Sequence, residues 1–242
     1  MSEARDRILI ALDVESQKEA DALLERLAGA VTGVKVGSQL FTAAGPAAVE
    51  AALKRGFRVF LDLKFHDIPN TVAGAVREAT RLGVFMLNVH ASGGLAMMHA
   101  ASEAAAKAAA EFKVPRPLCL GVTVLTSLDR RALATELGVH ANVPAHVLRL
   151  ADLAHAAGLD GCVASPQEIG LLRRALGDAW VIVTPGIRPA HADDDQARVA
   201  TPGAALRAGA DYLVIGRPIT GAPEPAAAVA AIVASLQRGG AP

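Results

Sequence analysis

The chain has 242 residues, of which 52% are hydrophobic, and its 24 lysine and arginine residues balance 24 aspartate and glutamate residues. This hydrophobic content supports a sizeable core and excludes global disorder. A formal net charge of zero argues against a dedicated nucleic-acid binder, which normally carries a basic excess. Aromatic residues make up only 3% of the chain, which argues against base stacking on single strands. We therefore expect no nucleic-acid partner.

No targeting or membrane segment is visible. The charged start MSEARDR leads into the short apolar run Ile8 to Leu12, whereas a signal peptide needs a longer one. The longest uncharged apolar run, Ala226 to Leu236, falls well short of the roughly 20 residues that span a bilayer. Cys119 and Cys162 both lie in apolar runs, which is typical of buried free thiols in a reducing compartment. We expect a soluble cytoplasmic protein without a membrane partner.

Short β-rich runs alternate along the chain with longer stretches rich in alanine and leucine. The β-rich runs are almost continuously apolar, as expected for parallel strands buried on both faces. The predicted strands are Ile8–Asp13, Val34–Gly37, Arg58–Leu63, Phe85–His90, Leu118–Leu125, Gly161–Ala164, Trp180–Thr184 and Tyr212–Ile215.

The stretches between these strands carry helix signals. Ser16 lies three residues before Glu19, which is the spacing of a capping box, and prolines at several starts suit a first helical turn. The predicted helices are Ser16–Ala28, Pro46–Arg55, Thr71–Arg81, Leu95–Phe112, Ala145–Ala157, Pro166–Leu176, Pro202–Ala208 and Pro225–Gln237.

This alternation predicts an α/β fold, a (β/α)8 or TIM barrel, as a single domain over residues 1–242. A doubly wound open sheet is the alternative, but eight strands are many for that class, and no GxGxxG turn follows the first strand. Pro185–Thr201 is the longest segment without a clear pattern. It follows the seventh strand, where barrels commonly bind phosphate groups, and a loop of this length is usually functional.

Polar residues collect at the carboxyl ends of the predicted strands, where barrel enzymes place their catalytic groups. These residues are Asp13, Lys35, Asp62, Lys64, His90, Thr126, Ser127, Arg188, Gly216 and Arg217.

The third strand is the most informative. Side chains alternate along a strand, so Asp62 and Lys64 point to the same side, with Phe60 below them inside the barrel. One interpretation is a structural ion pair that satisfies two buried charges. Lys35 and Asp13, expected on neighbouring strands, favour a functional site instead, because four alternating charges then meet at one barrel mouth.

The sequence closely resembles the orotidine 5′-phosphate decarboxylase family of the bacterial type over nearly its whole length. The most specific match is DLKFHDIPNTV at Asp62–Val72, because the shorter pattern DxKxxD also occurs in related sugar-phosphate decarboxylases and aldolases. The other matches are ALDV at Ala11–Val14, VKVG at Val34–Gly37, VTVLTS at Val122–Ser127, TPGIRP at Thr184–Pro189, DDQARVATP at Asp194–Pro202 and VIGRPIT at Val214–Thr220.

The resemblance implies removal of CO2 from orotidine 5′-phosphate to give UMP, with no metal and no organic cofactor. Lys64 matches the family's proton donor, and Asp62 matches the carboxylate beside the leaving group. Lys35 completes the catalytic charged row and, with Asp13, matches contacts to the ribose, although Lys35 also suits a plain ion pair with Asp62. Asp67 and Thr71 match residues that reach into the neighbouring subunit's site, so the resemblance implies a homodimer.

The phosphate end of the site is independently plausible. Gly216 allows close backbone approach to a phosphate, Arg217 and Arg188 can bind it bidentately, and Gln196 can donate from its amide. Thr126 and Ser127 suit contacts to the base or the ribose. The alternative is that both arginines are ordinary surface residues. We further expect the loop Pro185–Thr201 to close over the phosphate.

Two other functions remain open at this point. A related metal-dependent sugar-phosphate enzyme would require Mg²⁺. A catalytically silent phosphate-binding barrel is the other alternative, and the intact set of Asp62, Lys64 and Asp67 argues against it. The histidines lack metal-like clustering, so no metal site is predicted. His90 suits a satisfied core position better than a supporting role in the site, and alternation turns His66 away from Lys64.

Overall fold

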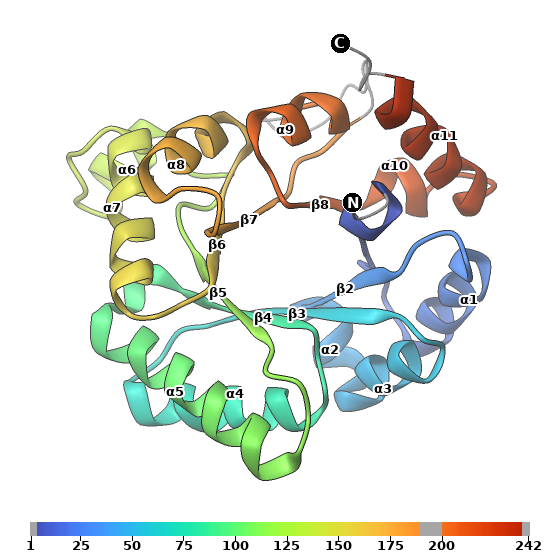
Figure 1. The fold of residues 1–242 in the computed structure, drawn as a ribbon, viewed down its shortest axis with the longest axis horizontal. Coiled ribbons are helices and arrows are strands. Elements are labelled where there is room, and N and C mark those ends of the chain that lie inside the picture. Colours follow the sequence, from blue (N-terminus) through green and yellow to red (C-terminus); the bar gives the residue numbers. More distant parts are fainter. Residues whose placement is uncertain (1–3, 189–199, 239–242) are drawn as a thin grey trace.

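Eight parallel strands form a closed barrel in the computed structural model, which describes residues 4–188 and 200–238. Neighbouring strands follow one another in chain order around the barrel, and β8 pairs with β1 to close it (Figure 1). The predicted (β/α)8 barrel is therefore confirmed. The strands are β1 Ile8–Ala11, β2 Gly33–Gly37, β3 Arg58–Phe65, β4 Met86–His90, β5 Leu118–Val122, β6 Gly161–Val163, β7 Val181–Thr184 and β8 Tyr212–Ile215.

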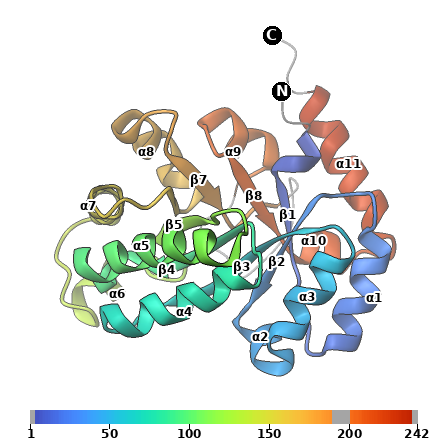
Figure 2. The same ribbon diagram turned by 60° about the horizontal axis from the view of Figure 1, so that its bottom comes forward.

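Helices surround the strands on the outside of the barrel, as the two views in Figures 1 and 2 show. The α-helices are α1 Gln17–Leu27, α2 Ser38–Ala44, α3 Pro46–Lys54, α4 Pro69–Arg81, α5 Leu95–Phe112, α6 Arg130–Thr135, α7 Val143–Ala156, α8 Ile169–Leu176, α9 Pro202–Ala208, α10 Arg217–Thr220 and α11 Pro225–Arg238. Short 3-10 turns lie at Ala4–Arg7, Ala91–Gly93 and Pro166–Glu168.

The period of two along each strand divides the core into two parts. One set of side chains points inward and fills the barrel, and the other set packs between the strands and the helices. The inward set is Leu9, Ala11, Phe60, Met86, Leu120, Val183 and Val214. Phe60 is 1% exposed and forms part of a dry floor below the carboxyl ends of the strands.

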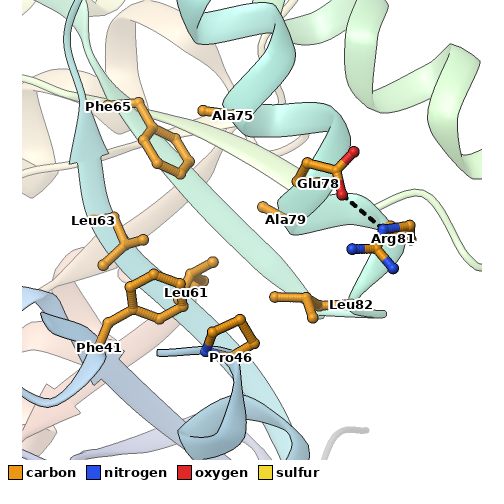
Figure 3. A pocket seen from close by; sticks show the side chains of 10 residues that line it. All are labelled: Phe41, Pro46, Leu61, Leu63, Phe65, Ala75, Glu78, Ala79, Arg81 and Leu82. Carbon is orange, nitrogen blue, oxygen red and sulfur yellow. Dashed lines mark hydrogen bonds and ion pairs between the residues drawn. The ribbon is translucent and has the colours of Figure 1, made fainter. Parts of the chain in front are cut away.

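The outward face of β3 confirms the alternation predicted for this strand. Leu61, Leu63 and Phe65 face α4 across an apolar cavity of about 240 Å³ (Figure 3). The carboxylate of Glu78 at this cavity accepts a hydrogen bond from Arg81. This cavity belongs to the packing between the barrel and its helices, and it lies on the opposite face of β3 from Asp62 and Lys64.

The structure contains short helices that the sequence pattern does not predict. α2, α6 and α10 bury Leu40, Leu133 and Ile219 respectively, one side chain each. Helices this short are not stable alone and form here because tertiary packing holds them. The predicted extension of the fifth strand to Leu125 is wrong, because β5 ends at Val122, opposite the last residue of the short β6.

Both cysteines are buried and free, as predicted. Burial raises the pKa of the Cys119 thiol and of the Cys162 thiol to about 12, so both remain protonated at neutral pH. Among the residues that the structure describes, no helix has the length and apolar character needed to cross a membrane.

Gly161 on β6 lies so close to β7 that a larger residue at this position should destabilise the fold. A methyl group on Gly161 would overlap the backbone of Val181 on β7 and would lie 2.7 Å from its Cβ. We expect Gly161→Ala to lower the free energy of unfolding by about 1–3 kcal/mol, measured by urea denaturation. Gly170→Ala on α8 is the control, because its nearest neighbour is the flexible end of Arg174 at 3.4 Å. Equal stability of the two variants would contradict the prediction.

Candidate active site

A row of alternating charges lies at the carboxyl ends of the first three strands. The Nζ atom of Lys35 lies 2.9 Å from Oδ1 of Asp13 and 3.4 Å from Oδ2 of Asp62. The Nζ atom of Lys64 lies 2.7 Å from the other oxygen of Asp62, Oδ1. Lys35 and Asp62 are buried, at 7% and 8% exposure. The predicted convergence of four charges at one barrel mouth is confirmed.

The backbone at Lys64 is unusual and determines where its ammonium group lies. Lys64 has φ of 53°, in the left-handed region that non-glycine residues rarely adopt. The register between β3 and β4 shifts between Leu61 and Phe65, so β3 bulges at this point. Bulges next to active sites re-aim side chains, and a strained backbone costs on the order of 1–3 kcal/mol that the surroundings must offset.

One residue of the site was not predicted from the sequence. Asn88 on β4 is 0% exposed, and its side-chain nitrogen donates to Oδ1 of Asp62 at 2.7 Å. Its side-chain oxygen accepts the backbone N–H of Lys64 at 2.8 Å. The sequence carries one sign of such a role, which is an asparagine within the apolar run of a buried strand. A buried amide needs hydrogen-bond partners, so it indicates polar neighbours inside the barrel.

The charged row lies where two cavities meet, and together they form one cleft. The cavities have volumes of about 170 Å³ and about 260 Å³, and both are lined by Lys35, Asp62, Pro185 and Val214. The smaller one is mostly apolar; its further lining residues are Phe60, Lys64, Val122, Val124, Leu125, Thr126, Val163, Ala164 and Ser165. The larger one is polar; its further lining residues are Ala11, Asp13, Gly186, Arg188, Gly216 and Arg217.

The arginines predicted for the phosphate end both line the polar cavity. Arg188 is only 7% exposed, and its Nη1 donates to the backbone oxygen of Ile187 at 3.0 Å. The interpretation of Arg188 as an ordinary surface arginine is therefore wrong. Arg217 is exposed and begins α10, directly after Gly216.

The two ends of the loop after β7 are joined by backbone hydrogen bonds. Arg188 donates to the backbone oxygen of Ala200 at 3.0 Å, and Ala200 donates to that of Gly186 at 3.3 Å. Residues 189–199 lie outside the described residues, and Gln196 is among them. The predicted contact of Gln196 therefore stays a prediction, as does closure of the loop.

Of the other predicted site residues, Thr126 lines one of these cavities, and Ser127, Asp67 and Thr71 line neither. Thr126 lines the apolar cavity, whereas Ser127 is exposed and lines neither of these two cavities. Asp67 and Thr71 are exposed and also line neither cavity. The Oδ1 atom of Asp67 accepts the backbone N–H of Ile68 at 2.6 Å. Their expected role in a neighbouring subunit's site stays a prediction.

Two histidines pack against each other beside the row. The ring centroids of His66 and His90 lie 5.3 Å apart. Burial lowers the pKa of His90 below its ordinary value of 6.5, and electrostatic interactions with His66 and Lys64 lower it further, against a smaller opposing effect of Asp62. His90 is therefore neutral at neutral pH and adds no charge to the site.

The chain is similar in sequence and in structure to known orotidine 5′-phosphate decarboxylases. It is 57% identical over 235 residues to the orotidine 5′-phosphate decarboxylase of Moorella thermoacetica, with coverage of 97% of this chain and 93% of that protein. It is 53% identical over 235 residues to that of Syntrophotalea carbinolica, with coverage of 97% and 96%. The crystal structure of orotidine 5′-phosphate decarboxylase from Lactobacillus acidophilus superimposes with a TM-score of 0.83 at 36% identity, covering 96% of this chain and 99% of that one.

The family model agrees with these pairwise similarities. The model for the orotidine 5′-phosphate decarboxylase / HUMPS family matches residues 6–232, which include every strand of the barrel and the whole charged row. The chain therefore belongs to the orotidine 5′-phosphate decarboxylase / HUMPS family.

Proposed function

We propose that this chain decarboxylates orotidine 5′-phosphate to UMP and CO2 in pyrimidine biosynthesis, without a metal or an organic cofactor. The observation that carries the proposal is the row Asp13–Lys35–Asp62–Lys64 at the junction of an apolar cavity and an arginine-lined cavity. The names of the two relatives described above support the same substrate.

The cleft suits a ligand with an apolar ring at one end and a phosphate at the other. The aliphatic walls of the smaller cavity suit a pyrimidine, with Thr126 available for a polar contact to the base or the ribose. Lys35 lines both cavities and Asp13 lines the polar one, so the two suit the ribose hydroxyls. Ser127, in the same segment, is proposed to contact the base or ribose when the site is complete.

The proposed chemistry needs a fixed cation beside the reacting ring carbon. When the bond from that carbon to the carboxylate breaks, its electron pair stays on the ring and CO2 leaves. The ammonium group of Lys64, held 2.7 Å from Asp62, stabilises this negative charge. Its Nζ then gives a proton to the ring carbon, which completes UMP.

Asp62 contributes a second, smaller effect in this proposal. Its carboxylate would lie beside the leaving carboxylate of the substrate and repel it. Two like charges about 4 Å apart at an effective dielectric constant of about 20 repel by roughly 4 kcal/mol. This corresponds to about three decades in rate. Stabilisation of the developing carbanion by Lys64 must therefore supply more of the acceleration.

The phosphate is proposed to bind at the polar end of the cleft. Arg188 and Arg217 line that end with Gly216, and a guanidinium matches a phosphate bidentately. Gln196 is proposed to donate from its amide, and the loop Pro185–Thr201 to close over the group. Binding energy from this remote group can then raise the rate of the chemical step.

The active form is proposed to be a homodimer in the cytoplasm, with residues 1–242 acting as one domain. Asp67 and Thr71 would enter the site of the neighbouring subunit, which fits their exposure on an isolated chain. Ile68 between them is 68% exposed, as expected for an apolar side chain that a second copy covers.

Replacement of Lys64 tests the mechanism directly. We expect Lys64→Ala to lose all measurable turnover of orotidine 5′-phosphate while it keeps the wild-type far-ultraviolet circular dichroism spectrum. The assay follows the change in ultraviolet absorbance as orotidine 5′-phosphate becomes UMP. Near-normal turnover by this variant would refute the mechanism.

The same assay on the wild type separates the proposal from a metal-dependent relative. Activity should be unchanged by EDTA, because Lys64 rather than a divalent ion stabilises the charge. Loss of activity in EDTA and recovery with Mg²⁺ would favour the metal-dependent alternative. A wild type inactive under both conditions would favour a silent phosphate-binding barrel.

Replacement of Arg217 tests the phosphate end. We expect Arg217→Ala mainly to raise KM, by roughly tenfold or more, because one charge-assisted contact contributes about 1.5–3 kcal/mol. Initial rates over a range of orotidine 5′-phosphate concentrations give KM and kcat separately. Arg207→Ala on α9 is a control, because Arg207 does not line the candidate cleft. Unchanged kinetics in Arg217→Ala would contradict the assignment.

Mixed dimers test the shared site. Lys64→Ala and Asp67→Ala should each be inactive alone, but a hybrid dimer would contain one intact site. Random mixing after dissociation should therefore recover about a quarter of wild-type activity. Recovery is measured with the same assay after the two variants are unfolded together and refolded. No recovery, with dimers present, would show that Asp67 serves its own chain.

A further inference from the structure

Asn88 is a fully buried polar residue that holds two parts of the charged row and does not line the cleft. It lies at the centre of β4, with 0% exposure, and is absent from the lining of both cavities. Alternation along β4 puts it on the inward side with Met86, beside Asp62 on β3. Any effect of Asn88 on the reaction must therefore act through its neighbours.

Its donor group fixes the orientation of the Asp62 carboxylate. The side-chain nitrogen lies 2.7 Å from Oδ1 of Asp62, the same oxygen that accepts from Lys64 at 2.7 Å. The other oxygen, Oδ2, is left to face Lys35 at 3.4 Å. The hydrogen bond from Asn88 thus prevents the carboxylate from rotating and assigns one oxygen to each lysine.

Its acceptor group holds the backbone of Lys64 in an unfavourable conformation. The side-chain oxygen accepts the N–H of Lys64 at 2.8 Å, at the residue where φ is 53° and β3 bulges away from the register of β4. A left-handed lysine persists only where its surroundings hold it. Asn88 supplies such a contact from the strand next to the bulge.

The two contacts together require an amide at this position. An amide has both a donor and an acceptor, and only one orientation satisfies the carboxylate and the backbone N–H at once. A carboxylate in its place would still accept from Lys64 but would repel Asp62. An apolar side chain of similar size would leave both partners without this contact.

We propose that Asn88 is a positioning residue that sets the geometry of the Asp62–Lys64 pair for catalysis. This inference rests on the proposed function of the same site. It predicts that the loss of Asn88 lowers kcat and leaves KM almost unchanged, because substrate contacts are retained while the reacting groups are misplaced. Misplacement of a catalytic group by about 1 Å costs roughly 100-fold in rate.

Two variants separate the two contacts. Asn88→Leu removes both of them at similar volume, and Asn88→Asp keeps the acceptor but loses the donor when the new carboxyl is ionised. This position contacts Asp62 and Lys64 directly and Lys35 through Asp62, and His90 lies two residues further along the same strand. Thr80→Val is the matched control, because Thr80 is also 0% exposed and its hydroxyl donates to Val76 within α4, away from the cleft.

Steady-state kinetics from about pH 6 to about pH 9 provide the first measurement. We expect kcat of Asn88→Leu to fall roughly 100-fold at every pH, with KM within about threefold of the wild type. For Asn88→Asp we expect a similar loss at high pH and partial recovery as the pH falls. Two carboxyls this close retain a proton into the neutral range, and the protonated group can donate to Asp62. Thr80→Val should keep the wild-type kcat.

Hydrogen exchange of the Lys64 backbone amide, followed by NMR, provides a measurement that does not depend on activity. Exchange should be at least about tenfold faster in Asn88→Leu, and unchanged in Asn88→Asp, which keeps the acceptor. If the wild type does not turn over orotidine 5′-phosphate, the proposed function fails, and the exchange data still decide the role of Asn88. If Asn88→Leu does not fold, the pH profile of Asn88→Asp decides it.

Three results would overturn the proposal. The first is kcat within about twofold of the wild type in both folded variants. The second is a loss in Asn88→Asp that does not vary with pH, which would indicate a general structural defect. The third is an equal rate of Lys64 amide exchange in Asn88→Leu and in the wild type.

Discussion

The carboxylate of Asp62 is the point on which the site depends. It receives an ion pair from β2 through Lys35, an ion pair from its own strand through Lys64 and a hydrogen bond from β4 through Asn88. A carboxylate that is 8% exposed is costly unless such partners compensate for its lost hydration. The three partners come from three adjacent strands, so the charge also ties the strands together at their carboxyl ends. The row is a single electrostatic unit centred on Asp62, and without Asp62 Lys64 would lose its ion pair.

The closed barrel is what makes this concentration of charge possible. Parallel strands in sequential order bring Asp13, Lys35 and Asp62 to one rim, and the inward period of two stacks Phe60 beneath them. The dry floor keeps the local dielectric constant low, which strengthens every interaction in the row. The same geometry places the loops after β7 and β8 on the same rim, so two arginines can share a cleft with the row although they are far away in sequence.

Much of this was predictable from the sequence, and the exceptions have physical causes. Strand periodicity predicts that Asp62 and Lys64 face the same side, and the sequential strand order predicts their meeting with Lys35 and Asp13. The left-handed backbone of Lys64 was not predictable, because it results from a register shift between β3 and β4 rather than from local preference. Asn88 was not predicted as a site residue for the same reason, because its side-chain contacts are to another strand. The roles of Asp67 and Thr71 come only from the family resemblance, because a single chain does not bring them to its own cleft.

The contacts around Asp62 also show that the charged groups are held in place without a bound substrate. Each reacting group is held by other protein groups: Lys64 by Asp62, Asp62 by Asn88, and Lys35 by Asp13. A site organised in this way needs no binding energy to assemble its charges, since folding has already placed them. In the proposed reaction, energy from phosphate binding at the arginine end can then bring the substrate carboxylate against Asp62, which is the unfavourable contact. The proposed reaction therefore requires a phosphate-binding end separate from the reacting end. The charge of Asp62 would repel the substrate carboxylate if the substrate were not held through its phosphate.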